Sequence, residues 1–164
     1  MPGRACLFAL FLSLFSVAAS AASKEDDTQA ATEIGKVVET FKAAIIAHDG
    51  QGLKALFLPD QGNWLSVMHE GLYQKVHALH PDRSRVEHSN YAEFADFVTA
   101  SKTPVEERFY DVRVESNGTI GMVYFDFDFL DDGKVRNRGS ETWQLIKTDG
   151  GWKIAAMLYS SRGG

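Results

Sequence analysis

The sequence has 164 residues, a net charge of −5 at pH 7 and a single cysteine, Cys6. This length is typical of one domain, and a net negative surface attracts neither nucleic acid nor anionic lipid, so neither is expected as a partner. With one cysteine, no disulfide can form within the chain.

The first 21 residues are typical of a secretory signal peptide. Arg4 precedes an apolar run from Ala5 to Phe15, and Ala19-Ser20-Ala21 has the small residues of a cleavage site. The run is shorter than the roughly 20 apolar residues of a membrane-spanning helix, so no membrane insertion is expected after cleavage. The mature chain would be periplasmic or secreted, without cysteine, and would carry a net charge of −6, because Arg4 is the only charged residue removed.

After the signal peptide, residues 22–29 are expected to form a flexible polar leader and residues 30–162 a single domain. Apolar residues at three- and four-residue spacing predict a first helix from about Thr28 to His48, and Asp49-Gly50 ends it. The stripe consists of Ile34, Val37, Val38, Phe41 and Ile45.

Shorter elements follow before Pro104. We predict a short helix over residues 53–57, a weak strand over residues 63–69 and a helical stretch over residues 72–79. Asn90 and Glu93 have the spacing of a capping box and begin a further helix.

From Val105 onward the pattern is extended. Tight-turn sequences recur at Asn117-Gly118, Asp132-Gly133 and Asp149-Gly150-Gly151, and residues of these types supply the positive φ angles of hairpin turns. Residues 105–160 are therefore predicted to form four antiparallel strands in a meander.

The loop lengths predict which residues share a face of this meander. Two-residue loops would place Tyr110, Phe125 and Arg138 on one face. The opposite face would carry Met122, Tyr124, Asp126, Glu141 and Trp143, and the face of the last strand stays open. Since both faces are apolar and helices can cover only one, a second copy is expected on the other, in a homodimer.

Three segments resemble the nuclear-transport-factor-2-like superfamily, in particular its SnoaL-like branch and exported bacterial members of unassigned activity. They are GSETWQLIKTDGGWKI (residues 139–154) followed by Tyr159-Ser160, FLPDQGNW (residues 57–64) and YFDFDF (residues 124–129). The resemblance implies an α+β, cone-shaped fold, with N-terminal helices packed on a strongly curved, mainly antiparallel sheet. It does not select a function, because members of this fold include enzymes and binding domains.

The leading functional prediction is an exported domain that holds a small apolar or amphipathic molecule in the cone. The ligand-binding residues would be Tyr110, Phe125, Arg138, Trp143 and Tyr159. No cofactor or metal is expected, since the spacing of His77 and His80 matches no familiar zinc signature.

Two alternatives stay open. An isomerase- or lyase-type enzyme would use Asp126 or Glu141 as general base and Tyr124 as donor, with Gly139 opposite Asp126 leaving room for a ligand atom. A protein-interaction module would instead use a face of the sheet to bind another protein.

Overall fold

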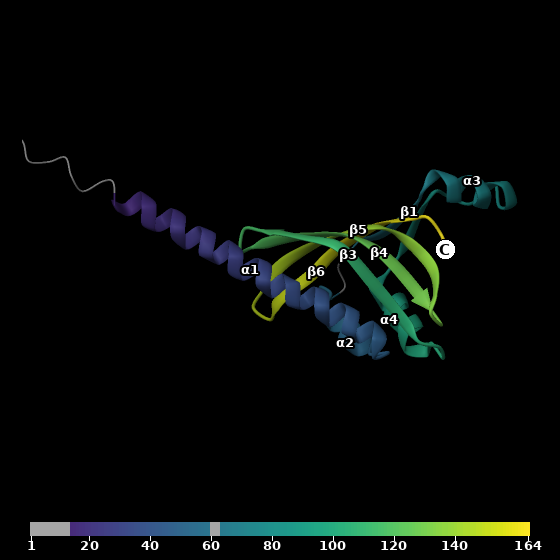
Figure 1. Ribbon diagram of the computed structural model, residues 1–164, viewed down its shortest axis with the longest axis horizontal. Coiled ribbons are helices and arrows are strands. Elements are labelled where there is room, and N and C mark those ends of the chain that lie inside the picture. Colours follow the sequence, from purple (N-terminus) through teal and green to yellow (C-terminus); the bar gives the residue numbers. More distant parts are fainter. Residues whose placement is uncertain (1–13, 60–62) are drawn as a thin grey trace, which may run out of the picture.

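The computed structural model describes residues 14–59 and 63–164, with side chains from residue 26 onward (Figure 1). The helices are α1 (Leu14–Ile46), α2 (Gly50–Ala55), α3 (Glu70–Leu79) and α4 (Tyr91–Ala100). The strands are β1 (Asn63–Met68), β2 (Val86–Ser89), β3 (Val105–Ser116), β4 (Ile120–Asp131), β5 (Lys134–Thr148) and β6 (Gly151–Ser161).

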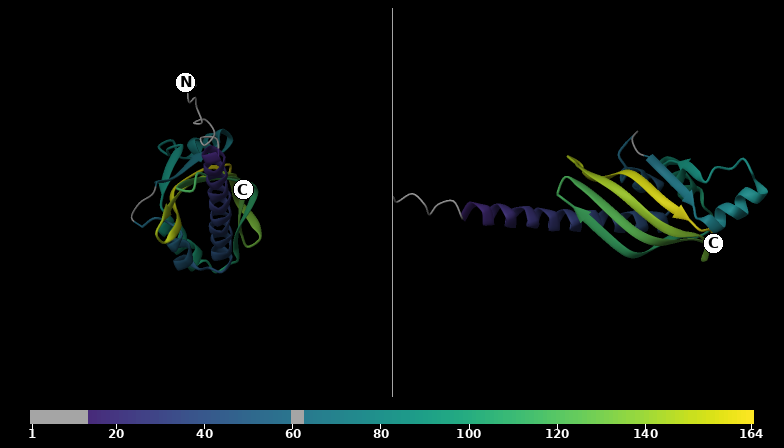
Figure 2. Two further views of the ribbon diagram at one scale, coloured as in Figure 1. Left: turned by 90° about the vertical axis from the view of Figure 1, so that its left-hand side faces the viewer. Right: turned by 90° about the horizontal axis from the view of Figure 1, so that it is seen from above.

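The six strands form one sheet in the order β2-β1-β6-β5-β4-β3. β1 runs parallel to β6 and every other pair is antiparallel. The sheet is curved, and the C-terminal part of α1 lies on its inner side (Figure 2). The N-terminal part of α1 extends beyond the sheet. The predicted α+β architecture with a four-strand C-terminal meander is confirmed.

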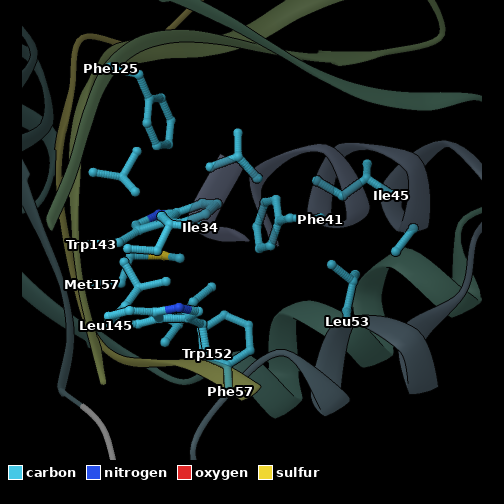
Figure 3. Packing of buried hydrophobic residues seen from close by; sticks show 14 of the residues in the cluster. Ile34, Phe41, Ile45, Leu53, Phe57, Phe125, Trp143, Leu145, Trp152 and Met157 are labelled. Atoms are coloured by element: carbon cyan, nitrogen blue, oxygen red, sulfur yellow. The ribbon is translucent and has the colours of Figure 1, made fainter. Parts of the chain in front are cut away.

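Helix α1 packs its predicted apolar stripe into the concave side of the sheet. Ile34, Phe41 and Ile45 are each at most 1 % exposed, and their side chains point toward Trp143 and Leu145 of β5 (Figure 3). Full burial of a side chain of this size stabilises the folded state by about 1.5–3 kcal/mol. The stripe is therefore the main attachment between helix and sheet.

The N-terminal segment differs in part from the prediction. Helix α1 continues through residues 22–29, which were expected to be a flexible leader. Of the predicted signal peptide, residues 1–13 lie outside the described residues. In the part of the chain that the structure describes, no helix has the length and apolar character needed to cross a membrane.

The smaller elements lie close to their predicted positions. The Asn90 side chain accepts a hydrogen bond from the Glu93 backbone N–H at 2.8 Å, so the predicted cap of α4 is confirmed. Strand β2 was not predicted, because its four residues are too few to show the alternation of apolar and polar residues that marks a longer strand.

The second of the three predicted hairpin loops has the expected two residues, and the third, whose length was left open, also has two. Asp132 and Gly133 both have positive φ, and Asp149-Gly150 joins Thr148 to its partner Gly151. The first loop is shifted: Ser116 pairs with Gly121, and the Asn117 backbone N–H donates to the Ile120 carbonyl. The meander is thus confirmed, but the register of its first hairpin is not the predicted one.

Three irregularities in the pairing reassign residues to faces. They lie between Tyr110 and Arg113 in β3, opposite Phe129/Leu130 in β5, and after Ile154 in β6. Each inserts one extra residue, so the side chains beyond it point to the opposite face from the one that a regular ladder would give.

The predicted face assignment is therefore wrong for several residues. Glu141 and Trp143 are buried on the concave face, whereas Tyr110 and Arg138 lie on the outer face with Tyr124 and Asp126. In the last strand, Trp152, Ile154, Met157 and Tyr159 face the core, whereas Leu158 is exposed.

Gly139 is required by a close approach between β5 and the end of β6. It pairs with Phe127 rather than with Asp126, and a Cβ there would lie 1.8 Å from the Ser160 carbonyl oxygen. The space expected to accept a ligand atom is therefore occupied by backbone.

Candidate functional site

A pocket of about 220 Å³ lies between the concave face of the sheet and helices α1 and α4. Seven of its ten lining side chains are aromatic. Phe97, which is 48 % exposed, is the most open of the aromatic side chains around it. The lining residues are Phe41, Trp64, Phe94, Phe97, Glu107, Phe127, Phe129, Asn137, Glu141 and Tyr159.

Glu141 is the first polar feature of this pocket. It comes from β5 and is only 5 % exposed, and its carboxylate accepts a hydrogen bond from Trp143 Nε1. Burial raises the pKa of Glu141 from its usual 4.5 to about 8, because the charged form is poorly solvated there; the hydrogen bond from Trp143 opposes this rise. At neutral pH this carboxyl therefore holds a proton most of the time.

Glu107 is the second buried carboxyl, and it reaches the same pocket from β3, on the other side of β4. It is 7 % exposed, burial raises its pKa well above the usual value, and the charge of Glu141 adds to the rise. Among the described residues, no ion pair includes either carboxyl. The pocket thus contains two interacting carboxyl groups with no cation from the chain to balance them.

Tyr159 places a phenol beside this pair. It lies opposite Glu141 in the β5–β6 ladder, and its ring packs edge-on against Phe127 with centroids 5.9 Å apart. Burial raises the pKa of Tyr159, a hydrogen bond with the buried Ser66 opposes the rise, and the charges of Glu141 and Glu107 add to it. The phenol therefore stays protonated and is available as a hydrogen-bond donor.

Trp64 contributes an unpaired donor to the wall of the pocket. Its Nε1 is fully enclosed and has no hydrogen-bond partner among the described residues. Trp64 also borders a small cavity of about 10 Å³ with Asn63 and Tyr91, which is room for about one water molecule.

The predicted site residues divide between the two faces of the sheet. Tyr159 lines the pocket, and Phe125 and Trp143 are fully buried in the core beside Glu141. Of the alternative catalytic set, only Glu141 lines the pocket.

The other predicted site residues lie on the outer face, where polar partners surround them. Arg138 lies 3.8 Å from the Asp128 carboxylate, and Asp126 accepts a hydrogen bond from Ser140 at 2.6 Å. Tyr124 lies under the Arg113 guanidinium at 4.5 Å. The structure does not bring these residues to the pocket between the sheet and the helices.

Sequence reasoning missed Glu107 and most of the aromatic lining. A signal for Glu107 was present, because Val105, Glu107 and Phe109 alternate on one face of a strand between two charged neighbours. A charged residue at an inward position of such an alternation indicates a buried carboxyl.

The arrangement can transfer protons and bind apolar or aromatic surface. Two carboxyl groups that interact in a poorly solvated pocket hold at least one proton between them at neutral pH, so one can donate while the other accepts. In the described part of the chain, no cluster of three or more His, Cys, Asp or Glu side chains could hold a metal ion.

The family model described as SnoaL-like domain matches residues 34–162 of this chain. The search of curated proteins found no match.

Solved structures share the fold at low sequence identity. A nuclear-transport-factor-2-like protein of unknown function from Pseudomonas putida is 13 % identical, with a TM-score of 0.61, over 81 % of this chain and 87 % of that one. A protein from Novosphingobium aromaticivorans, described as nuclear-transport-factor-2-like with a cystatin-like fold, is 13 % identical, with a TM-score of 0.60, over 92 % and 90 %. A protein of unknown function from Mycobacterium tuberculosis is 17 % identical, with a TM-score of 0.56, over 79 % and 74 %. At these identities the likeness shows the fold alone.

Proposed function

The chain belongs to the SnoaL-like domain family, and on this premise we propose that it binds one small, mainly apolar molecule in the aromatic pocket through a carboxyl pair that can give up a proton. The observation that carries the proposal is the pair Glu107 and Glu141, buried together without a cation. Burying carboxyl groups is unfavourable for folding, so their presence among aromatic side chains is better explained by binding than by stability.

Each part of the pocket has a role in this proposal. The aromatic side chains bury the apolar body of the ligand, as in most small-molecule sites. The protonated member of the carboxyl pair donates to a polar atom of the ligand, and the Tyr159 hydroxyl provides a second donor. This function agrees with the leading sequence hypothesis, although it uses a different set of polar residues.

Native mass spectrometry of the protein purified from its own cells tests the proposal. We expect a retained small molecule in the wild-type protein and its loss in Glu107→Gln/Glu141→Gln. Glu106→Gln is the matched control, because Glu106 is the neighbouring acid in β3 but forms an exposed ion pair with Arg108 at 2.9 Å. Retention of the molecule in the double variant would show that the carboxyl pair does not bind it.

An isomerase- or lyase-type activity is the second candidate, with Glu141 as general base and Tyr159 as donor. It is favoured by the pKa of Glu141, which lies near neutral pH and so suits a group that both takes and returns a proton. The recovered molecule, incubated with protein in D₂O, would gain carbon-bound deuterium with the wild type and not with Glu141→Gln. If the wild type catalyses no deuterium exchange, the second candidate is wrong and binding is the remaining function.

The outer face of the sheet supports a proposal of homodimerisation. Exposed apolar side chains gather there, and a groove of about 530 Å³ runs between β4, β5 and the end of β3. Such patches are uncommon on monomers, and a two-fold axis would place each patch on its copy. The exposed residues are Tyr110, Val112, Ile120, Met122 and Leu158.

Light scattering coupled to size-exclusion chromatography tests the dimer. We expect twice the chain mass for the wild type and the mass of one chain for Met122→Asp, because a buried unpaired charge opposes association. Met122→Leu, which keeps the apolar surface, should remain dimeric. A wild-type protein with the mass of one chain at micromolar concentration would remove the proposal, and the face would then be free for another protein.

A further inference from the structure

In the described part of the chain, the pocket that would bind the proposed ligand is lined by acidic groups and no basic ones. Its lining contains two carboxyl groups and, among the described residues, no Lys, Arg or His. Glu107 and Glu141 reach it from β3 and β5, so the two groups approach a ligand from both sides of β4. An anionic ligand would meet repulsion from any ionised carboxyl and no cationic side chain to bind it.

The chain itself leaves these carboxyl groups without a counter-ion. The nearby lysine of α1, Lys42, pairs instead with Glu39 at 3.1 Å and lies 6.0 Å from the Phe109 ring centroid, outside the lining. A buried carboxylate is stable only with a cation or several donors. Glu141 has one donor, Trp143 Nε1, and the pKa of the buried Glu107 is shifted by burial and the charge of Glu141, with no hydrogen bond contributing among the described residues.

The rest of the wall consists of aromatic rings set at different angles. Phe94 is tilted by 53° to Trp64 and by 65° to Phe129, with ring centroids 5.4 Å and 6.2 Å apart. Ring faces and edges therefore both reach the pocket. Aromatic faces attract organic cations through their quadrupole, most strongly where water is excluded.

Resting on the proposed function, we infer that the ligand carries one positive charge on an apolar body, as a quaternary or protonated amine. The cation would be paired with the carboxylate that its entry creates, and its alkyl groups would contact Trp64, Phe94 and Phe129. A neutral molecule would fill the same volume but would leave the carboxyl groups without the counter-ion that the chain omits.

The carboxyl groups of Glu107 and Glu141 determine how many protons are released or taken up when the ligand binds. Before binding, the Glu141 carboxyl holds its proton at neutral pH; as a permanent cation enters, its O–H bond breaks and the proton leaves to solvent. An amine that arrives unprotonated takes up the same proton, which forms its new N–H bond.

Affinity for a permanent cation should therefore rise with pH. The pKa of Glu141 is about 8 in the empty pocket, so binding should strengthen about tenfold per pH unit below that value and level off above it. The groups that face Glu141 are Glu107 on β3 and Tyr159 on β6, with Glu87 on β2 acting on Tyr159. Helices α1 and α4 and strands β1 and β4 contribute only aromatic side chains to the lining.

Choline and 3,3-dimethylbutan-1-ol form a matched pair of probes, because a carbon atom replaces the charged nitrogen and the shape is kept. Isothermal titration of the full mature protein should show choline binding roughly tenfold or more tightly than the alcohol. Its affinity should rise between pH 6 and 8, and about one proton should be released per choline bound at pH 6, where Glu141 is protonated in the empty pocket. In Glu107→Gln/Glu141→Gln the preference and the pH dependence should both disappear, whereas Glu106→Gln should keep both.

The outcomes separate this inference from the function on which it rests. If the alcohol binds as tightly as choline, the ligand is neutral, the inference is wrong and the pocket is still a binding site. If choline does not bind while native mass spectrometry finds a retained molecule, the inference is wrong and the proposed function stands. If neither probe binds and no molecule is retained, both are wrong.

Discussion

Replacing Glu141 with glutamine is expected to stabilise the folded protein at and above neutral pH. The carboxyl has a pKa of about 8 in the folded state against about 4.5 when unfolded, so the folded state holds the proton more tightly. The free energy of unfolding therefore falls as pH rises from about 4.5 to about 8, by about 1.4 kcal/mol per pH unit for a single such group. Glutamine removes this loss, and its amide oxygen still accepts from Trp143 Nε1.

Thermal unfolding between pH 5 and 9 measures the effect. The melting temperature of Glu141→Gln should exceed that of the wild type by on the order of 5 °C or more at pH 9, and the difference should vanish near pH 5. Glu107→Gln should act in the same direction, and the double variant should show the flattest pH profile. In the wild type, hydrogen bonds from Arg108 lower the pKa of the Glu106 carboxyl, so Glu106→Gln should gain no stability at pH 9. A wild-type protein that becomes more stable between pH 5 and 8 would contradict the buried pair.

Replacing Trp143 with alanine is expected to cause the largest loss of stability. The side chain is fully buried, and its ring lies 4.9 Å from Phe41, 5.2 Å from Phe125 and 5.9 Å from Phe109 between ring centroids. Truncation of a buried tryptophan costs about 3–5 kcal/mol, because transfer free energy is lost and a cavity is left. The change also removes the hydrogen-bond donor to Glu141.

Urea unfolding measures this loss, and Trp143→Phe is its matched comparison. Phenylalanine keeps an aromatic ring but lacks the N–H, so it should cost about 1–3 kcal/mol, from the smaller ring and the unpaired carboxyl. It should also raise the pKa of Glu141 further, because the hydrogen bond that opposes the rise is gone. A loss below 1 kcal/mol for Trp143→Ala would show that the ring stack does not stabilise the core.

The family and the order of the elements, apart from the short strand β2, could both be predicted from the sequence. The family was predicted from the segment of residues 139–154 and confirmed by the family match over residues 34–162. Helix α1 was predicted because residues from Ile34 to Ile45 recur at helical spacing. The meander was predicted because Asn-Gly and Asp-Gly turns act locally, and the backbone conformation of a turn depends on its own residues.

The candidate site could be predicted only in part. Glu141 and Tyr159 were recognised, but the predicted partners Tyr124 and Asp126 lie on the other face of the sheet. Successive side chains alternate between the two faces of a sheet only while the pairing of the strands is regular, so the face of one residue predicts that of the next only there. The extra residue in β5 lies between the Asp132-Gly133 turn and Glu141, so it reversed the predicted face of Glu141.

Local sequence therefore determined the longer elements, their order and the positions of the turns between them, because helical periodicity and turn chemistry depend on residues a few positions apart. Only the tertiary structure decided which carboxyl groups meet, because the extra residues that reverse side-chain faces appear only in the pairing between neighbouring strands. Glu107 and Glu141 are 34 positions apart in the sequence. They share a pocket because the curved sheet places β3 and β5 on either side of β4, with the aromatic side chains of α1 and α4 across from them.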